Sequence, residues 1–396
     1  ENYPRELKQL FSIGLFELNQ DGTVRCVENN PCQPGDTPAA TYDQNVVNNF
    51  TKVMTGWNFC NQTASCPNIA VGTVNYIDPM LLNAGVTTVG NNRHDLTAKT
   101  LLNYPGSTTT NIAACTNCTT LPNIATYANN SLNQALDNVF NHPTLGPYVS
   151  KVLIQHLVTS DPTPAYVSRV AAAFNNNGSG VRGDMKAVIT AILLDPEARG
   201  DAKTDPNFGK LREPVQLTTN LARTFDVTAA SGTGQSDGVF NGPTNNLLTN
   251  MAQSVFYSPT VFNYYSPDYK IPGTTMLGPE FSLMTTGTAV ARANFMNTMV
   301  VNNGIAVNGV NVPLGTRLNL AELQALSAAD PTGGQLLDAL NYKMLNGTMS
   351  EQMRSTILTA VTSITQSATP TATQTLDRAK QAVYLVATSS QYQIQR

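Results

Sequence analysis

The sequence predicts a mainly α-helical, multi-helix globular fold with little β-structure and one loop-rich lobe stapled by disulfides. Three observations support this prediction. Apolar residues recur at helical spacing along most of the chain from residue 123 onward. Residues 19–122 are instead rich in turn-forming residues and hold all six cysteines. The 396 residues show no repeat period and no linker-like segment. We therefore expect a single domain over 1–396 that contains the lobe 19–122.

The expected helices follow from these patterns in chain order. The first carries apolar residues at helical spacing between Leu7 and Leu18, with Pro4 in its first turn. The second is expected to end near Trp57, and short strand-like pieces are expected only within the irregular region 60–122. The remaining helices are expected at 132–140, 143–157, 164–174, 184–194, 213–225 and 280–301, and in three segments up to Arg396.

The composition indicates in which cellular compartment the protein works and which classes of partner it can bind. Charged residues make up 12% of the chain, about half the usual share, so the surface must be polar and largely uncharged. With 23 basic and 26 acidic residues and no Lys/Arg run, nucleic acid is excluded as an expected partner. No apolar stretch reaches the roughly 18–20 residues of a membrane span. This composition favours a secreted, periplasmic or cell-surface protein.

The chain begins at Glu1 inside a helix-like pattern and without a methionine. We therefore expect the domain to lack its N-terminal portion. Leu7 and Phe11 would then form an exposed apolar face, or a face covered by a protein partner or by the missing segment of the same precursor. A glycan is a further expected class of partner.

The six cysteines form three close pairs in sequence, as expected for disulfides in an oxidising compartment. The pairs are Cys26 and Cys32, Cys60 and Cys66, and Cys115 and Cys118. The alternative is a metal site that uses the C-x2-C pair, but C-x5-C spacing is loose for tetrahedral ligation. The connectivity is left open, because the second and third pairs could cross-link to each other. We expect three disulfides, no metal and no cofactor.

Sequence motifs for known chemistry are scarce. The run G-S-G-V-R-G at 178–183 matches a dinucleotide fingerprint in letters, but it follows a helix rather than a strand, which favours a turn. No G-x-S-x-G elbow, Walker loop or H-E-x-x-H is present. Lys210, Arg212 and Glu213, at a helix start in K-L-R-E-P, are expected to form partly buried ion pairs.

Two groups of polar residues remain as candidates for a site. His94, Asp95 and Lys99 lie together in an irregular segment, where a histidine beside a carboxylate can be a general base, a metal ligand or a structural hub. The second group lies at the start of the chain and comprises Glu1, Arg5 and Glu6.

Several motifs together resemble one known family. They include E-N-Y-P-R-E-L, T-G-W-N-F, H-D-L-T-A-K-T-L-L, K-V-L-I-Q-H-L-V-T-S-D-P, K-L-R-E-P and S-P-T-V-F-N-Y-Y-S-P-D-Y. In this order they resemble the bacterial "domain of unknown function 1800" family along almost the whole chain. We expect the chain to correspond to the C-terminal portion of the family domain. The resemblance implies an exported protein, often encoded beside a sulfatase-like companion. It implies no catalytic residues, and the cysteine-rich lobe departs from the shortest members.

Two functions therefore compete at the level of sequence. The first is a non-catalytic extracytoplasmic protein that binds a partner protein or a glycan or builds a surface assembly, with aromatic residues of 261–269 as a contact surface. The second is a secreted hydrolase that uses His94 and Asp95 with nearby carboxylates or a metal. Whether the protein is an enzyme is left open. A concave pocket that gathers His94, Asp95 and Glu1 or Glu6 would favour the hydrolase.

Overall fold

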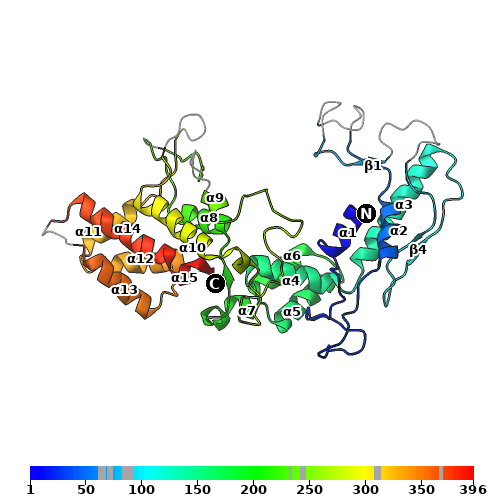
Figure 1. Ribbon diagram of the computed structural model, residues 1–396, viewed down its shortest axis with the longest axis horizontal. Coiled ribbons are helices and arrows are strands. Elements are labelled where there is room, and N and C mark those ends of the chain that lie inside the picture. The colour runs from blue at the N-terminus through cyan, green and yellow to red at the C-terminus, as the bar shows by residue number, and fades with distance from the viewer. Residues whose placement is uncertain are drawn as a thin grey trace. The chain divides into compact units, whose positions relative to one another are not determined.

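The computed structural model describes residues 1–60, 68, 75–82, 93–231, 234–240, 247–306, 314–364 and 369–396. Over these residues the chain forms two compact units. Unit 1 comprises Glu1–Leu153 and Pro162–Asp195, and unit 2 comprises Ile154–Asp161 and Pro196–Arg396. Helices supply most of the regular structure, and the described strands are short pairs (Figure 1). The predicted mainly α class with little β-structure is therefore confirmed. None of the described helices is both long and apolar enough to cross a membrane.

Unit 1 is built from helices joined by long irregular segments. Its helices are α1 (Asn2–Gln9), α2 (Gln44–Val53), α3 (Leu121–Phe140), α4 (Leu145–Leu157, which continues into unit 2), α5 (Pro164–Asn175) and α6 (Met185–Leu194). Its strands form two antiparallel pairs, β1 (Trp57–Asn58) with β2 (Leu81–Leu82), and β3 (Lys99–Thr100) with β4 (Asn111–Ile112). Helix α2 contacts α1, α3 and β3, and its Val47, Phe50 and Val53 are fully buried. Helix α2 is thus the centre of the unit 1 core.

The first helix is shorter than the apolar spacing predicts. Helix α1 ends at Gln9, and Leu18 instead lies in extended chain, where it forms a bridge with Val24. Gly14 breaks the helical path with φ +70°, a left-handed conformation that glycine adopts without strain. A Cβ at this position would lie 2.9 Å from the Tyr148 ring, so the close packing of that ring also requires glycine.

Unit 2 is a helical cluster around one long central helix. Its elements are α7 (Pro196–Arg199), η2 (Asp201–Thr204), β5 (Lys210–Leu211), α8 (Pro214–Thr224), α9 (Leu247–Asn250), η3 (Pro279–Leu283), α10 (Thr286–Met296), the π-helix η4 (Asn297–Val301), α11 (Ala321–Ala329), α12 (Gly334–Leu345), α13 (Glu351–Thr362), α14 (Ala372–Thr388), α15 (Ser390–Gln393) and β6 (Ile394–Gln395). Strand β6 pairs antiparallel with β5, with Lys210 opposite Gln395.

Small and β-branched residues place α14 at the centre of unit 2. Ala379, Ala382, Val383, Val386 and Ala387 are all fully buried along it. These short side chains allow α10, α11, α12 and α13 to pack closely around the helix. The helix expected at 280–301 is divided at Thr285, because its hydroxyl caps α10 in a reciprocal capping box with Thr288.

Two predicted disulfides are present in unit 1. Cys26 is bonded to Cys32 and Cys115 to Cys118, with Cα–Cα distances of 5.3 and 5.8 Å. Cross-linking between the second and third pairs is excluded by the Cys115–Cys118 bond. Cys66 lies outside the described residues, so the pairing Cys60–Cys66 stays a prediction.

Candidate functional site

The sequence-predicted group at the chain start forms a contact between α1 and α2. Arg5 Nη2 lies 3.6 Å from Glu1 Oε2 one helical turn away, and it donates to Gln44 Oε1 at 2.9 Å. Both charged side chains are substantially exposed. An exposed pair of this kind contributes little to stability, about 0–1 kcal/mol. Its effect is to hold α1 against the first turn of α2.

Glu6 shares α1 with Lys8, a buried lysine that the helical spacing does not single out. Glu6 Oε2 and the Tyr42 hydroxyl are buried without a hydrogen-bond partner among the described residues. Lys8 is fully buried; its Nζ donates to the Pro4 carbonyl at 2.6 Å and lies 4.2 Å from the Phe50 ring centroid. Burial lowers the pKa of Lys8 to about 7, and the Arg5 charge acts in the same direction. Helical spacing alone gave no sign that Lys8 points inward.

In the other predicted group, His94 is buried, and one of its two ring nitrogens has a hydrogen-bond partner. Its Nδ1 lies 2.8 Å from the Thr55 carbonyl, whereas Nε2 has no partner in the part of the chain that the structure describes. Burial lowers the pKa of His94, which favours the neutral imidazole near neutral pH. Asp95 is engaged elsewhere, because its Oδ1 accepts hydrogen bonds from the Thr97 amide and hydroxyl. Among the described residues, His94 therefore has no carboxylate hydrogen bond of the kind that orients a catalytic base.

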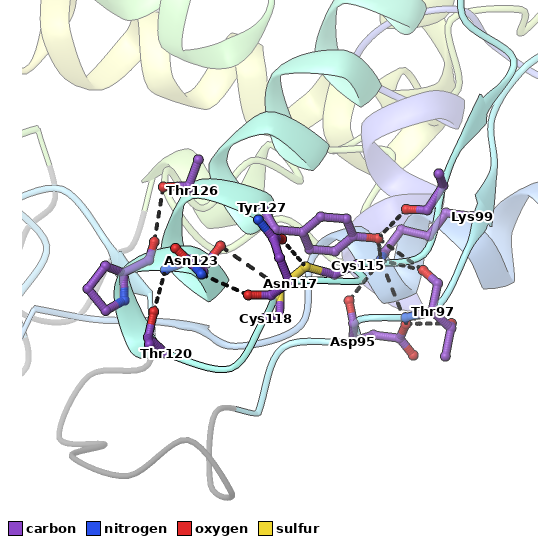
Figure 2. The surroundings of a disulfide bond; sticks show 12 residues. Asp95, Thr97, Lys99, Cys115, Asn117, Cys118, Thr120, Asn123, Thr126 and Tyr127 are labelled. Atoms are coloured by element: carbon purple, nitrogen blue, oxygen red, sulfur yellow. Dashed lines mark hydrogen bonds and ion pairs between the residues drawn. A yellow bond between two sulfur atoms is a disulfide. The ribbon is translucent and has the colours of Figure 1, made fainter.

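Lys99 is the hub of this group, as Figure 2 shows. Its fully buried Nζ donates to the carbonyls of Asp95 and Thr97 at 2.7 and 2.9 Å and to the Tyr127 hydroxyl at 3.1 Å. It also lies 3.7 Å from Asp95 Oδ1. Tyr127 comes from α3, and its hydroxyl lies 2.9 Å from the carbonyl of Ala113, just before the Cys115–Cys118 disulfide. Lys99 thus ties the loop-rich lobe to a helix.

The two groups contact opposite ends of α2. The Glu1–Arg5 pair meets Gln44, at the first residue of α2, and His94 meets Thr55, just after its end. Eleven residues at 1.5 Å each place these ends roughly 16 Å apart. No described hydrogen bond or ion pair joins the two groups, and the described residues show no cluster of three or more potential metal ligands.

The remaining sequence motifs have structural roles. The run 178–183 forms the turn between α5 and α6, where the Asn176 side chain accepts hydrogen bonds from Gly178 and Gly180. His142 is buried and its Nδ1 accepts from the Thr144 amide, a capping contact. His156 on α4 is exposed, whereas the neighbouring Gln155 is buried.

Unit 2 contains a second candidate, which we call the ionic cluster: Lys210, Arg212, Glu213, Glu280 and Arg292. All five are at most 8% exposed. Lys210 Nζ lies 3.4 Å from Glu280 Oε1, and the pair is fully buried. The other oxygen of Glu280 accepts from the Ser160 hydroxyl at 2.7 Å. The K-L-R-E-P motif predicts buried charge at three of these positions, but Glu280 and Arg292 join it only through tertiary packing.

Glu213 connects the ionic cluster to an irregular segment. It begins α8 in a capping box with Gln216, and its Oε2 accepts from Gln253 Nε2 at 2.7 Å. Burial raises the pKa of Tyr265, and the charge of Glu213 together with a hydrogen bond to it raises that pKa further. Gln253 and Tyr265 therefore hold both ends of the stretch between them to the same carboxylate.

Within that stretch we call residues 254–263 the contact loop, because they project aromatic side chains into solvent. Phe256 is 97% exposed and Tyr257 79% exposed. Phe256 and Asn263 have φ +68°, an uncommon conformation for residues other than glycine. The sequence places an aromatic contact surface at 261–269. Phe262 in that range is exposed, Tyr264, Tyr265 and Tyr269 are partly buried, and the most exposed rings lie earlier in the chain.

Comparison with models of protein families matches residues 1–394 to a family described as "Protein of unknown function (DUF1800)". The resemblance seen in the motifs is therefore confirmed. No curated protein and no solved structure matches the chain.

Proposed function

The chain belongs to the DUF1800 family of proteins of unknown function, and from that premise we propose that it is an extracytoplasmic, non-catalytic binding protein. The contact loop is its recognition surface. The observation that carries this proposal is the exposure of Phe256 and Tyr257 on a loop whose two ends are bonded to the buried ionic cluster.

The backbone of the contact loop supports a role beyond connection. Left-handed conformations of residues other than glycine cost about 1–3 kcal/mol each, and they persist where surrounding contacts enforce them. Here Phe256 adopts one at the exposed tip. The Tyr264 hydroxyl bonds to the Ser254 carbonyl and thereby closes the base of the loop. A large apolar ring held in water by a strained, closed loop is typical of a binding surface.

The chemistry of the loop favours an uncharged partner. Residues 254–263 carry no charged side chain and combine aromatic rings with Ser, Thr and Asn. Aromatic faces pack on apolar faces of sugars or on protein side chains, while hydroxyl and amide groups supply hydrogen bonds. A neutral glycan or an uncharged protein surface at the cell exterior fits this composition. The disulfides of unit 1 support an oxidising compartment.

The test is a binding comparison between the wild type and a double variant, Phe256→Ser with Tyr257→Ser. Binding to neutral polysaccharides and to cell-envelope protein fractions is measured by co-sedimentation and surface plasmon resonance. We expect the double variant to bind at least tenfold more weakly. The matched control is Tyr342→Ser, which removes a ring that is 80% exposed on α12. Equal binding by the wild type and the double variant would contradict the proposal.

The hydrolase remains the second candidate function because Nε2 of His94 has no hydrogen-bond partner among the residues that the structure describes. A neutral imidazole with one unbonded nitrogen could act as a base or a metal ligand. The proposal of a binding protein expects His94→Ala to lower stability and leave partner binding intact. Turnover of an ester, glycoside, phosphate or sulfate substrate that is lost in folded His94→Ala would favour the hydrolase instead.

A further inference from the structure

Two buried arginines of unit 2 lack a carboxylate partner among the described residues. Arg212 and Arg292 are 7% and 3% exposed, and neither lies within ion-pair distance of a described Asp or Glu. Arg212 packs over the Tyr392 ring, with its guanidinium carbon 4.6 Å from the ring centroid. Arg292 Nη1 donates to the Arg212 carbonyl and to Gln393 Oε1, both at 2.9 Å. The Arg292 guanidinium is thus held in place through its Nη1.

The other edge of the Arg292 guanidinium, formed by Nε and Nη2, has the geometry to bind a carboxylate. Its Nε and Nη2 are buried and have no hydrogen-bond partner in the described chain. Arg169 in unit 1 shows what such an edge binds, because its Nε and Nη2 hold the two oxygens of Asp195 at 2.7 and 2.8 Å. Two parallel N–H groups in this arrangement complement the two oxygens of a carboxylate.

The net charge of the ionic cluster indicates which charge a group bound to the open edge of Arg292 would carry. Lys210, Arg212 and Arg292 supply three positive charges, and Glu213 and Glu280 supply two negative ones. Glu280 is paired with Lys210, and Glu213 is hydrogen-bonded to Gln253. Burial lowers the pKa of Arg292 to about 10 although the charge of Glu213 acts to raise it. One positive charge is therefore left over in a buried place, where uncompensated charge is costly.

We propose that unit 2 binds a carboxylate ligand, with the Nε and Nη2 of Arg292 as its two donors. A single negative charge and two coplanar oxygens match the surplus charge and the open edge better than a doubly charged, tetrahedral sulfate or phosphate. Because Arg292 is 3% exposed, the ligand reaches it only when the neighbouring packing opens. The neighbouring irregular segment runs from Gln253 to Tyr265. The side chains of these two residues hold it to Glu213 of the ionic cluster.

The experiment observes the guanidinium directly in the intact chain. The Nε–Hε signal of Arg292 is followed by ¹⁵N NMR during titration with acetate, glucuronate and N-acetylglycine, and it is assigned by its loss in Arg292→Lys. We expect a saturable downfield shift with at least one carboxylate. Chloride and sulfate at equal ionic strength should bind at least tenfold more weakly. The glucuronate and N-acetylglycine arms distinguish an acidic sugar from a peptide terminus.

Thermal unfolding provides the second readout. The carboxylate that shifts the Arg292 signal should raise Tm of the wild type and of the control Arg354→Lys, which alters a partly exposed pair with Asp338. It should raise Tm of Arg292→Lys much less. An Arg292 signal that does not respond to any of the three carboxylates in the wild type overturns the proposal, whether or not Arg292→Lys folds. That result would not contradict the proposed binding function of the contact loop, because the double variant at Phe256 and Tyr257 tests that function separately.

Discussion

Long basic side chains in this protein are used inside the units as well as on the surface. Lys8, Lys99, Lys210 and Arg378 are all at most 1% exposed, and each has a carbonyl oxygen as an acceptor. A buried ammonium group is tolerated when it is hydrogen-bonded, and its loss leaves those carbonyls without a donor. Only 12% of the residues in this chain are charged, and these four buried ones contribute to the stability of the fold rather than to the solubility of the surface.

Lys8 makes the stability of unit 1 depend on pH. Its pKa is about 7 in the folded chain and 10.5 ordinarily. Between these values the unfolded chain binds more protons than the folded chain, so the free energy of unfolding rises with pH across this window. Below about pH 7 both states are protonated and the contribution of Lys8 no longer changes.

The variant Lys8→Met should remove this dependence. Urea unfolding measured between about pH 7 and about pH 10 should show a smaller rise in stability for Lys8→Met than for the wild type. Lys186→Met, at an exposed position, should keep the wild-type slope. Parallel slopes for the wild type and Lys8→Met would show that Lys8 stays protonated in the folded chain.

At the scale of elements, short disulfide loops reinforce segments that have little regular structure. Cys26–Cys32 and Cys115–Cys118 join residues six and three positions apart. Loops this short restrict the unfolded chain only moderately, by about 2 kcal/mol each in the chain-entropy description. The second bond lies beside the Lys99 hub (Figure 2). The Cys115 amide also donates to the Leu96 carbonyl at 2.9 Å.

Replacing both cysteines of either pair by alanine should therefore lower the free energy of unfolding by about 2 kcal/mol without loss of the fold. Denaturant titration measures this change. Peptide mapping without reduction is expected to find the two bonds and the third, Cys60–Cys66. Detection of Cys60 linked to any other cysteine would disprove the predicted connectivity.

At the scale of the whole molecule, the two compact units each have an apolar interior of their own. The core of unit 2 is a continuous cluster around α14 that includes Leu217, Phe295, Leu340 and Tyr392. Unit 1 is instead centred on α2. The family match runs through both units, so family membership does not separate them.

Leu340→Ala should destabilise unit 2 by about 2–5 kcal/mol, because it removes a fully buried side chain and leaves a cavity. Hydrogen exchange should show the largest loss of protection in α11, α12 and α14, with less change in α2 and α3. Tyr342→Ala, on the exposed face of the same helix, serves as the control. Equal loss of protection in both units would indicate that they unfold as one.

Much of the helical organisation could be predicted because periodicity and caps are local. Asp184 begins α6 by accepting hydrogen bonds from Lys186 and Ala187, as its place before an apolar run predicts. The first helix was predicted too long, because Leu18 keeps helical spacing although Gly14 interrupts the backbone. The sequence singled out His94, Asp95 and Lys99 as one group, and the structure gives each of them a hydrogen-bond partner. Their spacing could not show that Lys99 is the hub.

The sequence by itself determined the mainly α class and the family, because these depend on local spacing and on motifs that are read in order. It placed the cysteines in close pairs but left their connectivity open, and the structure decided it for Cys26–Cys32 and Cys115–Cys118. Only the tertiary structure decided which charges are buried and which aromatics are exposed. Glu280 and Arg292 lie far in sequence from Lys210 and Glu213. Their proximity depends on the contact of η3 with β5 and on the hydrogen bond from Arg292 of α10 to the Arg212 carbonyl. Likewise, Phe256 and Tyr265 are both aromatic residues of one segment, and only its backbone path directs the first outward and the second towards Glu213.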